Sequence, residues 1–149
     1  LTNSRTFVFS TKVTEVSHLL RKNSVDITLE EISRFVRHWS GGTDIGNAIK
    51  EINKTVLRNG RSKSTVLVII SDGYDSGSSH LSDEKSLAKE LKIVKQRLNK
   101  LVWINPMYGA SSFEIKAKAL KTAIPFVDHF LPAYNGKALH ALVKGLTKI

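Results

Sequence analysis

The apolar positions of this chain form short continuous runs that alternate with stripes at three- and four-residue spacing. The clearest run covers residues 66–70 and ends at Ser71, Asp72 and Gly73. A strand that is apolar at every position is typical of a parallel sheet covered on both faces. Because ligands bind just beyond the carboxyl ends of such strands, Asp72 is a candidate functional residue.

Other segments have the aromatic and β-branched residues that favour strands. These predicted strands are residues 5–10, residues 13–16 pairing back on them, residues 101–105 and residues 124–130. Between the strands, apolar stripes predict helices. The first runs to residue 39 from a cap at Asp26 or Thr28, with Leu29 in its stripe and Glu31 at capping-box spacing from Thr28. A second opens at Thr43, after two glycines.

Further helices are expected from a cap at residue 82, over residues 113–122 and over residues 136–148. The residues expected to face inward on the second and third helices are Ile45, Ala48, Ile49, Ile52, Val56, Leu87, Leu91, Val94 and Leu98. Alternating strands and helices predict one α/β domain over residues 1–149, with a doubly wound, mostly parallel sheet and helices on both faces.

Composition restricts the class of protein. The 149 residues fit one domain with a sizeable core, and the absence of cysteine excludes disulfides, thiolate metal sites and a cysteine nucleophile. That absence is compatible with a reducing compartment, and we expect a cytoplasmic protein. The longest apolar run is far too short to cross a membrane and no signal peptide opens the chain, so we expect no membrane partner.

The formal net charge of +10 is compatible with an acidic protein partner or with nucleic acid. The basic residues are spread along the chain without the interleaved aromatic residues that base stacking requires, so we do not expect nucleic acid as the partner. The five histidines share no metal-ligand spacing, and no Gly-x-Ser-x-Gly elbow marks a serine nucleophile.

Three polar connections are candidates for chemistry: Ser10-Thr11, the glycine pair with Thr43, and the Ser-Asp-Gly sequence that contains Asp72. The first and third follow strands, and a crossover would bring the second to the same edge of the sheet. The Thr43 hydroxyl and the Asp72 carboxylate would form a hard oxygen site suited to Mg²⁺ or Ca²⁺. Two protein ligands are too few for tight binding, so Mg²⁺ there would keep several waters.

Each of these residues also has a purely structural interpretation. Thr43 is a good N-cap for its helix, and Asp72 can accept hydrogen bonds from the amides that follow it in a turn. Asp44 suits the first turn of a helix as a partner for the helix dipole, and Asp75 is an exposed loop acid. A metal-assisted hydrolase at the same edge is an alternative function, but it needs further carboxylates around Asp72. A basic nucleic-acid-binding domain is another alternative.

Four segments carry a family resemblance. They are Phe-Val-Phe-Ser-Thr at 7–11, Trp-Ser-Gly-Gly-Thr-Asp-Ile-Gly at 39–46, Val-Ile-Ile-Ser-Asp-Gly-Tyr-Asp at 68–75 and Leu-Val-Trp-Ile-Asn-Pro at 101–106. Their order and content resemble a von Willebrand factor A (VWA) domain, most of all its CoxE-like bacterial branch. The resemblance covers most of the chain.

The resemblance implies a metal-ion-dependent adhesion site that binds a partner and does not catalyse a reaction. In this chain Thr43 matches the threonine that ligates the metal directly, and Asp72 matches the aspartate that often acts through a metal-bound water. The implied cofactor is Mg²⁺ or another divalent cation, and a partner carboxylate completes the site. The surrounding partner-binding residues would be Ser10, Thr11, Gly42, Asp44, Gly73 and Asp75. CoxE-like proteins are linked to MoxR-type AAA ATPases in metalloenzyme maturation, so such an ATPase is the expected partner.

One family motif has no counterpart here. The family carries Asp-x-Ser-x-Ser on a strand and helix before the Phe-Val-Phe-Ser strand, whereas residues 75–79 have Gly77 in place of the first serine and lie on another loop. We therefore expect the chain to lack that strand, its helix and the main metal ligands, so metal binding by this chain is weak or absent. The missing strand would leave an open slot in the sheet, through which the chain could self-associate.

Overall fold

The computed structural model describes residues 4–20, 24–36, 42–58, 62–76, 84–109, 114–133, 135 and 137. The elements within these ranges are β1 (Phe7–Phe9), β2 (Val13–Glu15), α1 (Val25–Phe35), α2 (Ile45–Thr55), β3 (Ser62–Ile70), α3 (Glu84–Arg97), β4 (Leu98–Asn105), α4 (Lys118–Ala123), the 3₁₀ helix η1 (Ile124–Phe126) and β5 (His129–Pro132).

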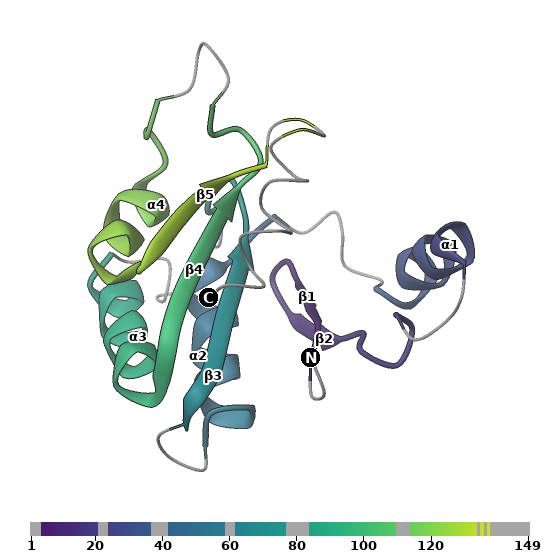
Figure 1. Cartoon of the computed structure of the whole chain (residues 1–149), viewed down its shortest axis with the longest axis horizontal. Coiled ribbons are helices and arrows are strands. Elements are labelled where there is room, and N and C mark those ends of the chain that lie inside the picture. Colours follow the sequence, from purple (N-terminus) through teal and green to yellow (C-terminus); the bar gives the residue numbers. More distant parts are fainter. Residues whose placement is uncertain are drawn as a thin grey trace.

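Two sheets are present in these ranges (Figure 1). Strands β3, β4 and β5 form a parallel sheet in which Ile69 lies opposite Trp103, and Trp103 opposite Phe130. Crossover helices α3 and α4 connect its successive strands, as parallel pairing requires. Strands β1 and β2 form a separate antiparallel hairpin, as the sequence predicts, and within the described residues no strand joins the two sheets. The fold is therefore α/β with a mostly parallel sheet.

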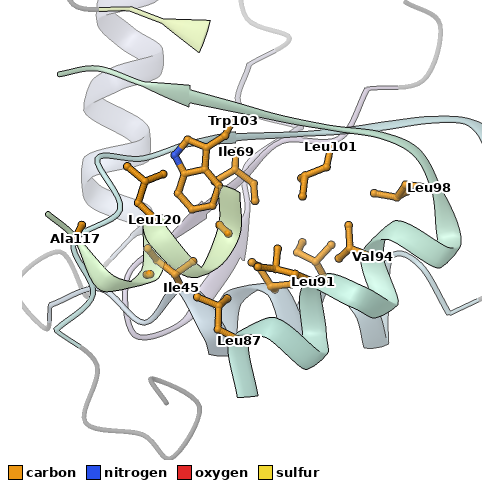
Figure 2. Close-up of a cluster of buried hydrophobic side chains, with 14 of the residues drawn as sticks. Ile45, Ile69, Leu87, Leu91, Val94, Leu98, Leu101, Trp103, Ala117 and Leu120 are labelled. Atoms are coloured by element: carbon orange, nitrogen blue, oxygen red, sulfur yellow. The ribbon is translucent and has the colours of Figure 1, made fainter. Parts of the chain in front are cut away.

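The main core lies between the three-stranded sheet and helices α2, α3 and α4 (Figure 2). Most of the predicted inward positions are confirmed, with Leu91 and Val94 fully buried on α3 and Ile45 almost fully buried on α2. Two positions are wrong in their element: Leu98 is buried but begins β4, and the half-buried Val56 follows the end of α2. From the sheet, Leu101 and the large indole of Trp103 fill the space between these helices without any exposed surface. Burial of such side chains is the main contribution to the stability of the domain.

Burial on both faces, which the sequence predicts for residues 66–70, is wrong for β3. Leu67 and Ile69 pack towards the core, but Val66 and Val68 are exposed and Ile70 has 62% of its surface exposed. The alternation arises because α2, α3 and α4 all contribute to the cluster on one face of the sheet. By contrast, β4 is buried at every position from 101 to 105, so both of its faces are covered there, as expected for a strand of a parallel sheet.

The start of α1 also differs from the prediction. The helix begins at Val25 after Ser24, so Thr28 lies inside it and donates its hydroxyl to the Ser24 carbonyl at 2.7 Å. The expected capping box with Glu31 is therefore wrong, because both residues lie beyond the first turn. Leu29 is 57% exposed, since the buried side of α1 is formed by Ile32. A second small cluster covers this side and comprises Val16, Leu19, Ile32 and Val36.

The final strand begins later than predicted. Residues 124–126 form η1 instead of a strand, because Pro125 lacks a backbone N–H and favours the start of a helical turn. The preceding helix is also shorter than residues 113–122, since α4 begins at Lys118. The expected end of the first helix at Trp39 is wrong, because α1 ends at Phe35 and Val36 is its C-cap. The expected helix over 136–148, apart from Lys137, and the cap at residue 82 lie outside the described residues.

Asp128 connects three elements at the start of β5. Its backbone N–H donates to the Leu101 carbonyl at 2.8 Å, and its carboxylate accepts the Leu101 N–H at 2.7 Å. The other carboxylate oxygen accepts from the Lys95 ammonium on α3. Burial raises the pKa of Asp128, but the hydrogen bonds from Lys95 and Leu101 outweigh it and hold the pKa below its ordinary value of 3.8.

We expect Asp128→Asn to lower the free energy of unfolding by about 1 kcal/mol at pH 7, because one charge-assisted bond is lost from a partly exposed group. A carboxyl whose pKa is lowered on folding stabilises above its unfolded pKa, and this contribution disappears as the pH falls through the folded value. Thermal unfolding should therefore separate the two proteins at pH 7 and bring them together well below pH 3.8. Glu114→Gln, which removes an exposed ion pair with Lys116, should change little at any pH.

Gly73 needs to be glycine because the turn after β3 is pressed against α4. Its φ is +83°, and a Cβ built there would lie 2.6 Å from Cβ of Leu120. Gly42 has a similar φ of +79°, but its built Cβ would meet the movable Oγ of Ser76 at 2.4 Å. The two glycines thus share the backbone strain of a substitution but differ in how readily the neighbour can shift.

We expect Gly73→Ala to destabilise the domain by about 2–4 kcal/mol, since left-handed strain adds to overpacking against a buried leucine. Gly42→Ala should cost less, about 1–2 kcal/mol of strain and up to about 1 kcal/mol more, because Ser76 Oγ can move away from the new Cβ only by giving up its hydrogen bond from the Thr43 N–H. Urea denaturation of both variants measures the difference. Equal losses would mean that contact with Leu120 does not constrain the turn.

Candidate functional site

Hydrogen bonds join the loop after β1 to the start of α2. The Asp44 N–H donates to the Ser10 carbonyl at 2.9 Å, and the Asn47 side-chain amide donates to the Thr11 carbonyl at 3.3 Å. Both acceptors follow β1, and both donors belong to the beginning of α2. The connection into α2 therefore lies at the carboxyl end of β1.

The same connection is joined to the loop after β3. The Thr43 N–H donates to the Ser76 hydroxyl at 2.9 Å, and the Ser76 N–H donates to the Thr43 carbonyl at 2.9 Å. Since residues 71–76 directly follow β3, this reciprocal pair brings the loop of Thr43 and the loop of Asp72 to one edge of the domain. The three connections compared in the sequence meet there, and we call them the loop edge: residues 10–11, 42–44 and 71–76.

Asp44, and not Thr43, is the N-cap of α2. Its side chain accepts the Asn47 N–H at 2.8 Å, and the residue is only 4% exposed. An aspartate at this position satisfies one of the free amides of the first turn and favours the positive end of the helix dipole. In the described part of the chain, the hydroxyl of the half-buried Thr43 takes part in no hydrogen bond, so it is available to a ligand.

Asp72 is exposed and forms a local turn. One carboxylate oxygen accepts the Tyr74 N–H at 3.0 Å, which is the turn role that the sequence leaves open for it. The Asp72 carbonyl accepts from the Asn105 side-chain amide at 3.3 Å. The second carboxylate oxygen of Asp72 has no hydrogen-bond partner among the described residues, so the turn fixes the side chain while leaving that oxygen for a ligand.

Two residues that position the loop edge were not identified from the sequence as doing so. Asn105 is fully buried at the end of β4 and bonds to both the Asp72 carbonyl and the Met107 N–H. The Trp103 indole N–H donates to the Ser71 carbonyl at 2.9 Å. The signal that could have revealed Asn105 is a polar residue inside an otherwise buried run, because a buried amide requires partners.

The other predicted partner-binding residues also lie in these loops. Ser10 is 6% exposed, and its buried hydroxyl has no hydrogen-bond partner among the residues that the structure describes. Gly73 is buried, Thr11 and Gly42 are half-buried, and Asp75 is half-buried in the loop that Asp72 begins. The loops therefore contain every residue that the sequence singled out, although only some of their side chains are open to solvent.

The oxygen atoms of the loop edge suit a Mg²⁺ ion that keeps most of its waters, and they are too few to surround an ion with protein ligands. Thr43 and Asp72 offer one hydroxyl and one carboxylate oxygen, which are hard ligands. The orphaned Ser10 hydroxyl adds an unsatisfied polar atom in the adjoining loop. Across the described ranges, no three His, Cys, Asp or Glu side chains come together as a metal site. Most ligands of such an ion would be water or partner oxygens.

A groove of about 450 Å³ lies between the hairpin and α2, apart from the loop of Asp72. Its lining residues are Arg5, Phe7, Lys12, Val13, Glu15, Asn47, Glu51 and Thr55. The Arg5 guanidinium binds the Glu15 carboxylate through two hydrogen bonds and, with the Ser17 hydroxyl, lowers the pKa of Glu15 to about 2. This pairing joins the segment before β1 to β2, and it leaves Lys12 and Glu51 as the other charged residues of the lining.

A comparison with known proteins identifies the family of this chain. No helix in the described ranges has the length and apolar character needed to cross a membrane. No curated protein and no solved structure matches the chain significantly. The model of one family, described as VWA domain containing CoxE-like protein, matches residues 1–139. Since this match covers most of the sequence, the chain belongs to the CoxE-like branch of the VWA domain family.

Proposed function

We propose that the loop edge is the surface through which this domain binds a protein partner, and that Thr43 and Asp72 hold a hydrated Mg²⁺ between the two proteins. The family match supports a protein-interaction module at the coarse level. The observation that carries the finer proposal is the reciprocal hydrogen bonding of Thr43 and Ser76, which brings the hydroxyl-bearing and carboxylate-bearing loops together.

Binding, and not catalysis, is the function that these residues support best. A hydrated Mg²⁺ at Thr43 and Asp72 would offer a coordination position to a carboxylate of the partner. The protein's own part is to fix the two oxygens: Ser76 fixes the backbone of Thr43, and the turn to Tyr74 fixes Asp72. Asn105 and Trp103 secure the same loop from β4.

The partner that we propose is a MoxR-type AAA ATPase in metalloenzyme maturation, presenting an acidic side chain to the loop edge. The resemblance to CoxE-like proteins suggests this class of partner. The positive charge of the chain supports an acidic contact, because complementary charge raises the rate of association.

Metal binding can be tested without a partner. We expect Mg²⁺ titrated into the isotope-labelled domain to shift the amide resonances of residues 43 and 72–76 with a dissociation constant of about 1 mM or weaker, since only two protein oxygens contribute. Asp72→Asn keeps a side-chain oxygen for the Tyr74 N–H but removes the charge, so it should abolish the shifts. The matched control is Asp26→Asn, at an exposed position of α1. Shifts that persist in Asp72→Asn would place the ion elsewhere.

Partner binding is tested with a purified MoxR-type ATPase and biolayer interferometry. We expect Asp72→Asn and Asp72→Ala to weaken binding at least about tenfold in Mg²⁺, because loss of a charged contact costs on the order of 2 kcal/mol. Chelation of Mg²⁺ should weaken the wild type to the same level, while Asp26→Asn should bind normally. Equal affinity in Mg²⁺, in chelator and in both Asp72 variants would reject the proposal, provided that their melting temperatures match.

A further inference from the structure

Helices α3 and α4 carry exposed lysines on the side that faces away from the sheet. Lys89 and Lys92 lie opposite the buried side of α3, and Lys118 and Lys121 are the exposed residues of the first turn of α4. The two helices are in contact and cover the same core (Figure 1). We call these four residues the lysine surface; Lys85 is exposed one turn before Lys89.

The charge pattern of this surface differs from that of the other helices. On α1, Glu30 pairs with Arg34, and on α2, Glu51 pairs with Lys54. In the described part of the chain, none of the four residues of the lysine surface forms an ion pair. Neighbours three residues apart on a helix repel one another when they carry like charges. Both α3 and α4 therefore keep a repulsion between exposed lysines, whereas on each of α1 and α2 a glutamate pairs with one of the cations.

Two nearby acidic residues are bonded to groups outside the lysine surface. The Glu90 carboxylate accepts from the Asn53 side chain on α2, and Lys95 is engaged by Asp128. Among the described residues of α3 and α4, Glu84 is the one exposed acid. A local cost that the fold leaves uncompensated is expected where the surface has a function.

We propose that the lysine surface is an electrostatic docking surface for an acidic region of a protein partner. An opposing set of carboxylates would relieve the repulsion and accelerate association. The surface lies close to the loop edge, since α4 packs through Leu120 against Gly73, so one partner can contact both. The inference rests on the proposed function only in taking the partner to be a protein; the lysine surface itself requires neither Mg²⁺ nor Asp72.

The composition of the surface favours an acidic protein over nucleic acid. All four cations are lysines, which act as hydrated point charges, whereas arginine supplies the planar, bidentate contacts typical of base and phosphate recognition. The exposed positions of α3 and α4 include no aromatic residue on which a base could stack. The lysines also lie on the outer side of two packed helices, whereas proteins that bind single-stranded nucleic acid place their cations in a groove along the nucleic-acid backbone.

The test replaces all four lysines by glutamine and measures binding to a 20-residue poly-L-glutamate, with EDTA present so that the metal site plays no part. We expect about a tenfold loss of affinity at low salt, from four contacts that are individually weak. The control changes four exposed cations elsewhere to glutamine, namely Lys12, Lys54, Arg58 and Lys137, and should lose less than about threefold, since the net charge falls equally. Equal losses in the two variants would overturn the proposal.

Two further probes determine the class of partner. A 20-nucleotide single-stranded DNA and vesicles containing anionic lipid are titrated against the same two variants. If either probe loses more affinity than poly-L-glutamate on removal of the lysine surface, the acidic-protein assignment is wrong. The Asp72→Asn variant separates this proposal from the proposed function. In EDTA it should bind poly-L-glutamate as the wild type does, because the lysine surface does not require Asp72. Loss of the metal site and loss of the lysine surface can therefore be told apart.

Discussion

The reciprocal hydrogen bonds between Thr43 and Ser76 are the interaction on which the site depends. Residue 43 lies before α2 and residue 76 lies after β3, so the chain between them forms a whole helix, a connection and a strand. Without this pair, the two loops would be related only indirectly, through the packing of α2 and β3 in the main core. A backbone-to-backbone bond and a backbone-to-hydroxyl bond fix both position and orientation, and Gly42 supplies the positive φ at the approach.

The β4 strand provides the platform beneath this pair. It is the central strand of the parallel sheet and is buried at each position from 101 to 105, so its side chains are held by packing from several elements. Two of those side chains combine an apolar environment with a polar contact: the indole of Trp103 and the amide of Asn105 both reach the residues after β3. The hydrophobic core thus determines where Asp72 lies, because buried polar groups accept only well-placed partners.

Sequence reasoning located the edge better than it described the individual side chains. The alternation of apolar runs and stripes was sufficient to place Asp72 at a strand end and Thr43 before a helix, because period and chain order are local properties. It could not tell Thr43 from Asp44 as the N-cap of α2, since both residue types are good N-caps and the two positions are adjacent in the sequence. It also misjudged Ile70, because an apolar run does not reveal which face the helices cover. The contacts of Asn105 and Ser76 depend on tertiary structure, which local patterns do not contain.

The proposed cation site at the loop edge has few protein ligands, and this gives the proposed lysine surface a complementary role. One carboxylate and one hydroxyl supply little binding energy for a cation that holds its waters strongly. Specific recognition then has to come from a wider contact, in which the local site fixes the register and a larger charged surface raises the rate of encounter. The fold places the proposed metal site and the lysine surface near each other, since Gly73 allows α4 to pack against the same loop that carries Asp72. Sequence separation hides this relation, because residues 73 and 120 become neighbours only when α4 packs against the turn that follows β3.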